Sequence, residues 1–311
     1  MAPLPNPKAR KGITHQFSKR LVAFEHVPNS IDSHSKNVII FIGGLFDGLL
    51  TVPYASSIAD HLPPAWTLAQ VLLSSSYTGW GTASLQTDVA ELSEAVSYFR
   101  TIKDGKIILM GHSTGCQDVM EYLTGPGHES RAPINGGIIQ APVSDREAMK
   151  IMLDPALYRE SCVVATAMVE SGNGEEILPS RETKGFFPAP VTARRWLSLA
   201  SPHHDGDDDY FSSDLPDERL EKSFGSLPPY SPLCILFSGS DEFVSKELDK
   251  AALVKKWIGF VKRGAGKVDE DFSGILDGAS HNLSGNPDHV VQGLVKRVLG
   301  FVNALTSQST L

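Results

Sequence analysis

The sequence predicts an α/β fold, in which a mostly parallel central sheet is flanked by helices and carries a helical insertion. Three observations support this prediction. Short apolar runs alternate with amphipathic stretches over most of the chain, which is typical of repeated strand–helix units. Between residues 144 and 229 the helical patterns continue without a strand pattern. The 311 residues, 41% hydrophobic and 21% charged, suffice for one packed core with an insertion.

Short apolar runs bounded by turn residues predict the strands of the sheet. The run Asn37–Ile42 ends at two glycines, and the run Lys106–Met110 contains four consecutive apolar residues. Runs of this kind are expected of strands that are buried on both faces, as in a parallel sheet. The predicted strands are residues 21–25, 37–42, 67–73, 106–110, 137–140, 233–237 and 272–276.

Helices are predicted where apolar residues recur every three or four positions. In residues 85–99, Leu85, Val89 and Leu92 share one face. The helix at residues 116–123 is stopped by the glycines and proline that follow it. Other helices are predicted at residues 146–153, 155–169, 193–199, 246–261 and 290–304. We therefore predict a single domain over residues 1–311, with a cap inserted at residues 144–229.

The segment Gly111-His112-Ser113-Thr114-Gly115 is a Gly-x-Ser-x-Gly motif. Composition alone produces this pattern in about one in ten chains of this length, so its context decides its meaning. Here it stands directly between a predicted buried strand and a predicted helix, as in the nucleophile elbow of α/β-hydrolases. In that turn small residues allow strand and helix to pack closely, and the serine hydroxyl is exposed above the sheet. The sequence thus predicts the α/β-hydrolase fold with Ser113 as nucleophile; a structural turn is the alternative.

A serine hydroxyl needs a base, and the base needs a carboxylate that orients it. In this fold the chain order is Ser, then Asp or Glu, then His. Asp241 follows the predicted strand at 233–237 and is the first choice for the carboxylate, with Glu242 next. Asp145, after the preceding strand, is a further alternative. A solvated acid on a loop is the non-catalytic interpretation of Asp241.

Of the ten histidines, His281 alone stands on the loop between the last predicted strand and the last predicted helix. This position makes it the predicted general base, with a capping or surface role as the alternative. His112 lies inside the elbow, where its side chain is expected to point away from the serine into packing. His289 lies at the closing helix and is expected on the surface.

Ester hydrolysis also requires N–H donors aimed at the developing oxyanion. One predicted donor is the backbone N–H of Thr114, the residue after the nucleophile. Gly43 and Gly44, after the strand at 37–42, allow the backbone of that loop to approach a bound substrate closely. We therefore expect Gly44 to touch the substrate and the N–H of Leu45 to be the second donor. A simple turn is the alternative for these glycines.

The predicted cap contains an acidic loop that runs from His203 to Asp214. Its histidines and aspartates are crowded and match neither an EF-hand nor zinc-site spacing, so no metal site is predicted. We interpret it as a solvated loop. If it borders the pocket, Asp207, Asp208 and Asp209 would bind positively charged groups of a substrate.

Composition excludes several classes of partner. The net charge of −8 repels phosphate backbones, so no nucleic-acid partner is expected. No apolar run approaches about 20 residues, so no membrane span is predicted. No apolar stretch follows the basic residues near the N-terminus, so no signal peptide is predicted. We interpret that region as a solvated, partly disordered lead-in; its basic residues are Lys8, Arg10, Lys11, Lys19 and Arg20.

The cysteines point to a reducing compartment. Cys116, Cys162 and Cys234 are an odd, widely spaced set in apolar surroundings, without a Cys-x-x-Cys pair. They are predicted to be buried thiols rather than a disulfide framework. A cytoplasmic location follows.

With these motifs in place, the sequence resembles a family of fungal α/β-hydrolases long catalogued as a domain of unknown function. The resemblance covers nearly the whole chain, and the motifs of the predicted cap are specific to that family. The matching stretches are Phe41-Ile42-Gly43-Gly44-Leu45, Ser75-Ser76-Tyr77-Thr78-Gly79-Trp80-Gly81, Gln140-Ala141-Pro142-Val143-Ser144-Asp145-Arg146-Glu147, Arg195-Trp196-Leu197-Ser198-Leu199-Ala200-Ser201-Pro202 and Asp207-Asp208-Asp209-Tyr210-Phe211-Ser212-Ser213-Asp214.

Within that family the sequence looks like the siderophore ester hydrolases. This resemblance implies hydrolysis of the ester bonds of fusarinine C or triacetylfusarinine C, with release of iron inside the cell. It carries Ser113, Asp241 and His281 over as the catalytic triad, and it implies no cofactor. A general carboxylesterase or thioesterase is the alternative within enzymes. A ligand-binding protein of this fold with weak or no turnover is the alternative from another class.

Overall fold

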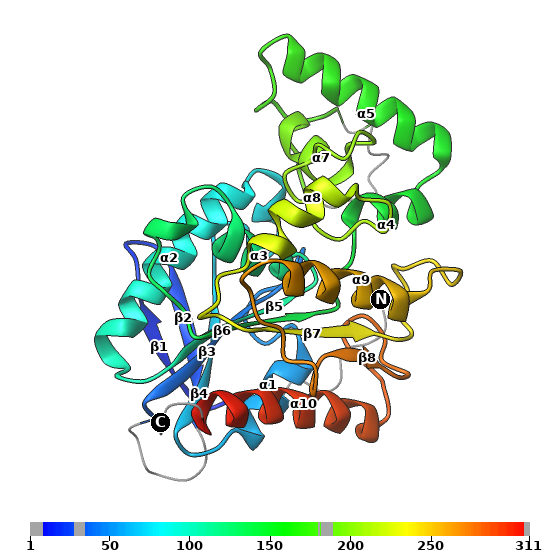
Figure 1. Cartoon of the computed structure of the whole chain (residues 1–311). Coiled ribbons are helices and arrows are strands. Elements are labelled where there is room, and N and C mark those ends of the chain that lie inside the picture. Colours follow the sequence, from blue (N-terminus) through cyan, green and yellow to red (C-terminus); the bar gives the residue numbers. More distant parts are fainter. Residues whose placement is uncertain (1–8, 28–34, 180, 182–188, 308–311) are drawn as a thin grey trace.

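The computed structural model describes residues 9–27, 35–179, 181 and 189–307, and its centre is an eight-stranded sheet (Figure 1). The strand order across the sheet is β1-β2-β4-β3-β5-β6-β7-β8. In chain order the strands are β1 (Gly12–Gln16), β2 (Val22–His26), β3 (Asn37–Ile42), β4 (Trp66–Val71), β5 (Ile107–His112), β6 (Gly136–Gln140), β7 (Leu233–Ser238) and β8 (Gly274–Leu276).

The register of the strands brings several loops to one edge of the sheet. β1 pairs with β2, and β2 with β4, in antiparallel fashion, and all other neighbours are parallel. Ile42 at the end of β3 is opposite Gly111, and Gln140 at the end of β6 is opposite His112. The loops that follow β3, β5 and β6 therefore emerge side by side, where α/β sheets place their binding sites.

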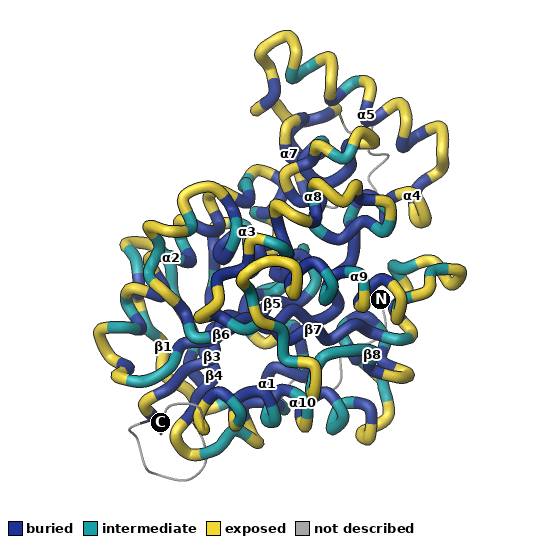
Figure 2. Tube along the Cα trace, in the orientation of Figure 1, coloured by how far each residue is buried: buried dark blue, intermediate teal, exposed yellow. Residues whose placement is uncertain are grey.

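Helices cover both faces of the sheet because alternate strand residues point to opposite sides. On one face Val38, Ile40 and Ile42 of β3 belong to a buried cluster shared with α2 (Leu85–Ile102), α3 (Gly115–Thr124) and α9 (Lys250–Arg263). On the other face Ile39 and Phe41 pack with α1 (Pro53–His61) and α10 (Asp288–Ser307). Figure 2 shows the central strands buried between these layers. No helix of the described ranges combines the length and apolarity needed to cross a membrane.

Residues 144–229 form a helical segment that projects beyond these layers (Figure 1). It contains α4 (Asp145–Met152), α5 (Pro155–Glu170), α7 (Ala193–Ala200) and α8 (Asp217–Lys222), and none of its described residues joins the central sheet. The first three helices start at capping side chains that accept backbone N–H bonds: Ser144, Asp154 and Thr192. Trp196 is at the centre of a buried cluster of its own. That this segment acts as a cap stays a prediction.

The structure bears out the predicted strands and most helices, and it corrects two regions. The prediction of a solvated lead-in is wrong for residues 12–16, which form β1 against β2; Lys8 lies outside the described residues. The helix α1 was missed, since it is only nine residues long and follows a loop rather than an amphipathic stretch. The predicted helix at 246–261 begins later, at Lys250, because Asp249 caps it. The three cysteines are buried and free, as predicted.

A buried ion pair fixes the antiparallel edge of the sheet onto α2. Lys103, which follows α2, donates from Nζ to Glu25 Oε1 of β2 at 2.5 Å, and both residues are buried. Thr67 and His15 also bond this carboxylate. Burial alone raises the pKa of Glu25, but the hydrogen bonds from Lys103 and Thr67 outweigh it and hold the pKa below the ordinary value. The stabilisation by this carboxylate is therefore present above its ordinary pKa and is lost as the pH falls.

Removing one partner of this pair is expected to cost more than removing both. Lys103→Met leaves Glu25 buried without its cation and should lower the free energy of unfolding by about 3 kcal/mol. The double variant Glu25→Leu/Lys103→Met should recover part of that loss. Urea unfolding of both variants measures the difference. Lys262→Met, in an exposed pair with Glu270, is the control; an equal loss there would contradict the burial argument.

Candidate active site

Ser113 occupies a strained turn between β5 and α3. Its φ is 53°, in the left-handed region that non-glycine residues rarely adopt. A Cβ at Gly111 would lie 2.1 Å from the carbonyl oxygen of Gly115, and one at Gly115 would lie 2.5 Å from that of Ile42. Side chains are therefore excluded at both positions, as the motif predicted. The turn is held by the backbone N–H of Ser113, which donates to Gln140 O at 3.1 Å.

The structure brings Ser113, His281 and Asp241 into one hydrogen-bonded row. The hydroxyl Oγ of Ser113 lies 2.8 Å from His281 Nε2, and His281 Nδ1 lies 2.8 Å from Asp241 Oδ2. Because a carboxylate only accepts, Nδ1 carries the proton and Nε2 is left to accept from the serine. Asp241 follows β7 and His281 follows β8, so both loops are at the same edge of the sheet as the elbow. The row has the geometry of a nucleophile, a base and an orienting acid.

The two alternative carboxylates have other partners. Glu242 accepts the backbone N–H of His281 at 2.9 Å and so holds the loop rather than the ring. Asp145 accepts from the side-chain amide of Gln117 at 2.7 Å. Of the three acids considered from the sequence, Asp241 is the one that bonds the imidazole of His281.

A tight turn places the loop after β3 against the nucleophile. The N–H of Asp47 donates to Gly44 O at 3.0 Å, and the N–H of Gly44 donates to Asp47 Oδ2 at 2.9 Å. Phe46 has a φ of 67° and its ring contacts Trp80 edge-on. Within the described residues the N–H of Leu45 bonds no protein group, so it is the donor left over for an oxyanion. Its predicted role stays a prediction.

Thr114, the other predicted oxyanion donor, is the N-cap residue of α3. Its backbone N–H lies at the N-terminal end of the helix, directly after Ser113. The unpaired N–H groups of a helix N-terminus carry partial positive charge, which favours an anion there. Leu45 and Thr114 thus belong to two different segments, the loop after β3 and the start of α3.

A buried hydrogen-bond network lies behind this row, and Gln140 is at its centre. Its Nε2 donates to Ser238 Oγ at 3.0 Å and to the carbonyl oxygen of His281 at 3.4 Å. Its Oε1 therefore accepts from Tyr54 Oη at 2.6 Å and from His112 Nδ1 at 2.7 Å. A carbonyl oxygen cannot donate, so this orientation of the amide is required and fixes the proton of His112 on Nδ1.

His112 is buried as predicted, but it bridges the elbow to Gln140 rather than only filling space. Burial lowers its pKa to about 4, and the nearby His281 lowers it further in the same direction. The two rings lie 4.9 Å apart between centroids. A neutral His112 therefore avoids placing a second positive charge beside the base. His289 is exposed, as predicted.

The expectation of a solvated acidic loop is wrong for Asp208 and Asp209, which are 3% and 6% exposed. Arg195 of α7 bonds Asp208 at 2.6 Å, and Arg146 of α4 bonds Asp209 at 3.1 Å. Each of these two carboxylates is thus paired inside the protein, and removing its arginine would leave a buried charge unpaired. Asp207 is exposed, and a role for it in substrate binding stays a prediction. The described residues hold no cluster of three side chains suited to a metal ion.

Comparison with known proteins places the chain in a family. A family model described as a protein of unknown function, DUF1749, matches residues 1–303. The chain belongs to the DUF1749 family. Fusarinine C esterase sidJ from Aspergillus fumigatus is 36% identical over 341 residues, covering 94% of this chain and 96% of that protein.

Solved structures show the α/β-hydrolase fold. The siderophore hydrolase EstB from Aspergillus fumigatus superposes with a TM-score of 0.82 at 37% identity, covering 97% of this chain and 99% of that one. A soluble variant of monoglyceride lipase from Saccharomyces cerevisiae matches with a TM-score of 0.61 at 13% identity, covering 98% and 99%. At that identity the likeness is one of fold alone.

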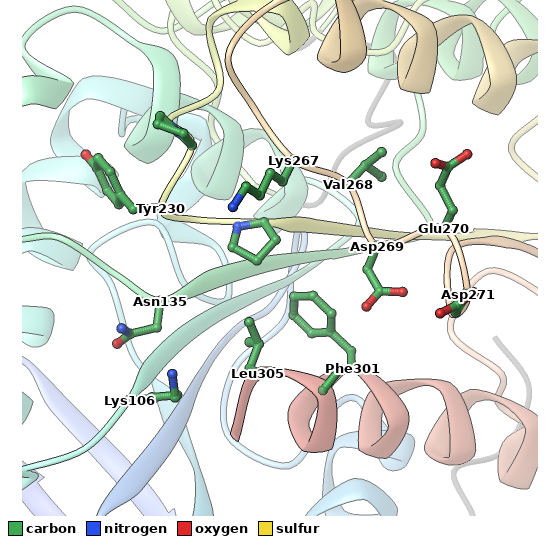
Figure 3. A pocket seen from close by; sticks show the side chains of 13 residues that line it. Lys106, Asn135, Tyr230, Lys267, Val268, Asp269, Glu270, Asp271, Phe301 and Leu305 are labelled. Atoms are coloured by element: carbon green, nitrogen blue, oxygen red, sulfur yellow. The ribbon is translucent and has the colours of Figure 1, made fainter. Parts of the chain in front are cut away.

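A cavity of about 600 Å³ in this DUF1749 protein lies away from Ser113 (Figure 3). Lys106, Asn135 and Pro232, which line it, immediately precede β5, β6 and β7. The cavity is therefore at the N-terminal edge of the parallel strands, whereas Ser113 is at the opposite edge. In this view Lys267 lies above Lys106 and Phe301, and all three side chains line the cavity. It has no part in the chemistry at the serine.

Two residues that hold the site, Asp47 and Gln140, were missed from the sequence, and a third, Glu242, has a role other than the predicted one. Asp47 and Gln140 use their side chains to hold the loop after β3 and the loop that carries His281. In the sequence, the one sign that Gln140 has a special role is its position as a polar residue at the end of an apolar strand. Glu242 was considered only as an orienting acid, although it bonds the backbone of the base.

The contact between Gly44 and the nucleophile yields a direct prediction. A Cβ at position 44 would lie 2.6 Å from Ser113 Cβ and 3.1 Å from its Oγ. Gly44→Ala should therefore displace the serine or the loop and lower kcat for an ester substrate by about 100-fold or more. Circular dichroism and thermal unfolding should remain close to wild type. Gly259→Ala on α9, whose Cβ meets no atom within 4 Å, is the control and should keep full activity.

Proposed function

We propose that this chain is a serine esterase that hydrolyses ester bonds of hydroxamate siderophores of the fusarinine C and triacetylfusarinine C type. One observation carries the proposal: Ser113, His281 and Asp241 are aligned with 2.8 Å contacts at the carboxyl edge of the sheet. The relatives supply the substrate class, since one is named a fusarinine C esterase and another a siderophore hydrolase, at 36% and 37% identity over nearly the full chain.

In the proposed mechanism His281 Nε2 removes the proton of Ser113 as Oγ attacks the ester carbonyl carbon. Asp241 keeps the Nδ1–H tautomer and stabilises the imidazolium that forms. The backbone N–H groups of Leu45 and Thr114 bind the oxyanion of the tetrahedral intermediate. His281 then protonates the alcohol that leaves, and the acyl group stays on Ser113. Water, deprotonated by His281, repeats the attack and releases the acid.

The chemistry requires no cofactor in this scheme, and iron enters only as part of the substrate. Cleavage of the ester bonds converts a cyclic hydroxamate ligand into separate monomers. Each monomer binds the metal less tightly, because the hydroxamate groups are no longer linked within one molecule. The proposal places this step inside the cell, in the cytoplasm, as the free cysteines suggest.

The test is mass-resolved hydrolysis of fusarinine C and triacetylfusarinine C, each with and without iron. Wild type should produce linear fragments and then monomers in succession, and Ser113→Ala should produce none. Asp241→Asn should lower kcat by about 10⁴-fold, because the wrong tautomer of the histidine is favoured.

Two other outcomes would each identify a different function. Absence of siderophore cleavage together with Ser113-dependent hydrolysis of p-nitrophenyl esters or thioesters would identify a general carboxylesterase or thioesterase. Stoichiometric binding of a siderophore without product over hours would identify a ligand-binding protein of this fold.

A further inference from the structure

Asp145 is an acid beside the proposed catalytic row that the mechanism does not use. It is the first residue of α4 and lies five residues after Gln140, whose carbonyl oxygen binds the N–H of Ser113. Gln117 holds one of its carboxylate oxygens, Oδ2, from α3, one helical turn beyond the serine. The residue remains partly exposed. Asp145 therefore lies, partly exposed, at the same edge of the sheet as Ser113.

The basic side chains around Asp145 form ion pairs with other acids. Arg195 on α7 bonds Asp208 and the carbonyl oxygen of Trp80. Arg146, the next residue on α4, pairs with Asp209 and Asp214. Across the described ranges no lysine, arginine or histidine lies within 4 Å of the Asp145 carboxylate, and Oδ1 has no hydrogen-bond partner there. Asp145 is thus a partly exposed acid near the nucleophile without a counter-ion.

Burial and the neighbouring charges together act on the carboxylate of Asp145. Burial raises the pKa of Asp145 to about 7, and the nearby Asp208 and Asp209 raise it too, whereas Arg195 and His281 lower it. A positive group brought beside this carboxylate would lower the energy of its ionised form, and a negative group would be repelled.

We propose that Asp145 is a substrate-binding residue that selects esters carrying a protonated amine. The inference rests on the proposed esterase activity and adds the charge class of the substrate. The free oxygen Oδ1 would accept a hydrogen bond from the ammonium group, while Gln117 holds Oδ2. A charge-assisted bond of this kind is worth about 1.5 to 3 kcal/mol, which corresponds to roughly a 10- to 100-fold preference.

The test compares p-nitrophenyl 6-aminohexanoate with p-nitrophenyl heptanoate, in which a methyl group replaces the ammonium. Wild type should favour the amine ester in kcat/KM by about 10-fold or more. Asp145→Asn should remove that preference, mainly through a higher KM for the amine ester, and should change kcat/KM for the heptanoate less than twofold. Asp145→Glu, which keeps the charge, should retain part of the preference.

The pH dependence of the preference adds a readout that a purely structural role would not change. The carboxylate forms as the pH rises through about 7, while an alkyl ammonium with a pKa of about 10 stays charged. The ratio of kcat/KM values should therefore rise between pH 6 and 8 in wild type and stay flat in Asp145→Asn.

Controls separate this inference from the proposed function. Asp217→Asn removes the same charge from an exposed position of the 144–229 segment and should leave the ratio unchanged. Ser113→Ala should abolish turnover of both esters. Ser113-dependent turnover with a ratio that Asp145→Asn does not alter overturns the inference and leaves the esterase. Absence of Ser113-dependent turnover of any ester overturns both.

Discussion

The close approach of three backbone segments at Ser113 is the constraint on which the site depends. The end of β5, the start of α3 and the loop after β3 meet where Gly111, Gly115 and Gly44 have no side chain, and a Cβ at any of them would overlap a neighbour. The parallel register of β3, β5 and β6 brings these segments to the same edge. The strain of the left-handed serine is maintained because burial on both faces of the sheet fixes every strand around it. The rigid sheet thereby holds the hydroxyl group of Ser113 in one defined position.

Positions of the other reacting groups follow from hydrogen bonds rather than from packing. Gln140 joins α1, the elbow, the end of β7 and the base loop through one side chain that is fully buried. Asp47 fixes the loop after β3, and Phe46 in that loop contacts Trp80, which belongs to the buried cluster of the 144–229 segment. Packing of that segment is therefore connected by direct contacts to the loop that carries Leu45.

Much of the fold was predictable because its information is local. The strands of the parallel sheet are apolar on both faces, and the helices show a clear period, so both stand out in the sequence. The elbow was predictable since a fixed order of strand, turn and helix surrounds the motif. What was missed depends on partners distant in sequence: β1 exists because β2 offers an edge, and Gln140 matters because His112, Ser238 and His281 converge on it. The prediction of a solvated acidic loop was wrong for the same reason. Its aspartates read as solvated until Arg146 and Arg195, on two other elements, are placed against them.

The carboxylates around the site show how one functional group acquires different properties from its surroundings. Asp241 accepts from the ring of His281 and from the N–H of Phe243, so its charge is satisfied by donors on both oxygens. Asp208 and Asp209 are each bonded to an arginine. Asp145 has a neutral amide on one oxygen only, and no basic side chain of the described ranges forms an ion pair with it. A buried charge without a counter-ion is costly unless binding supplies one. Asp145 is partly exposed at the same edge of the sheet as Ser113, so its counter-ion can come from a bound molecule instead of from the fold.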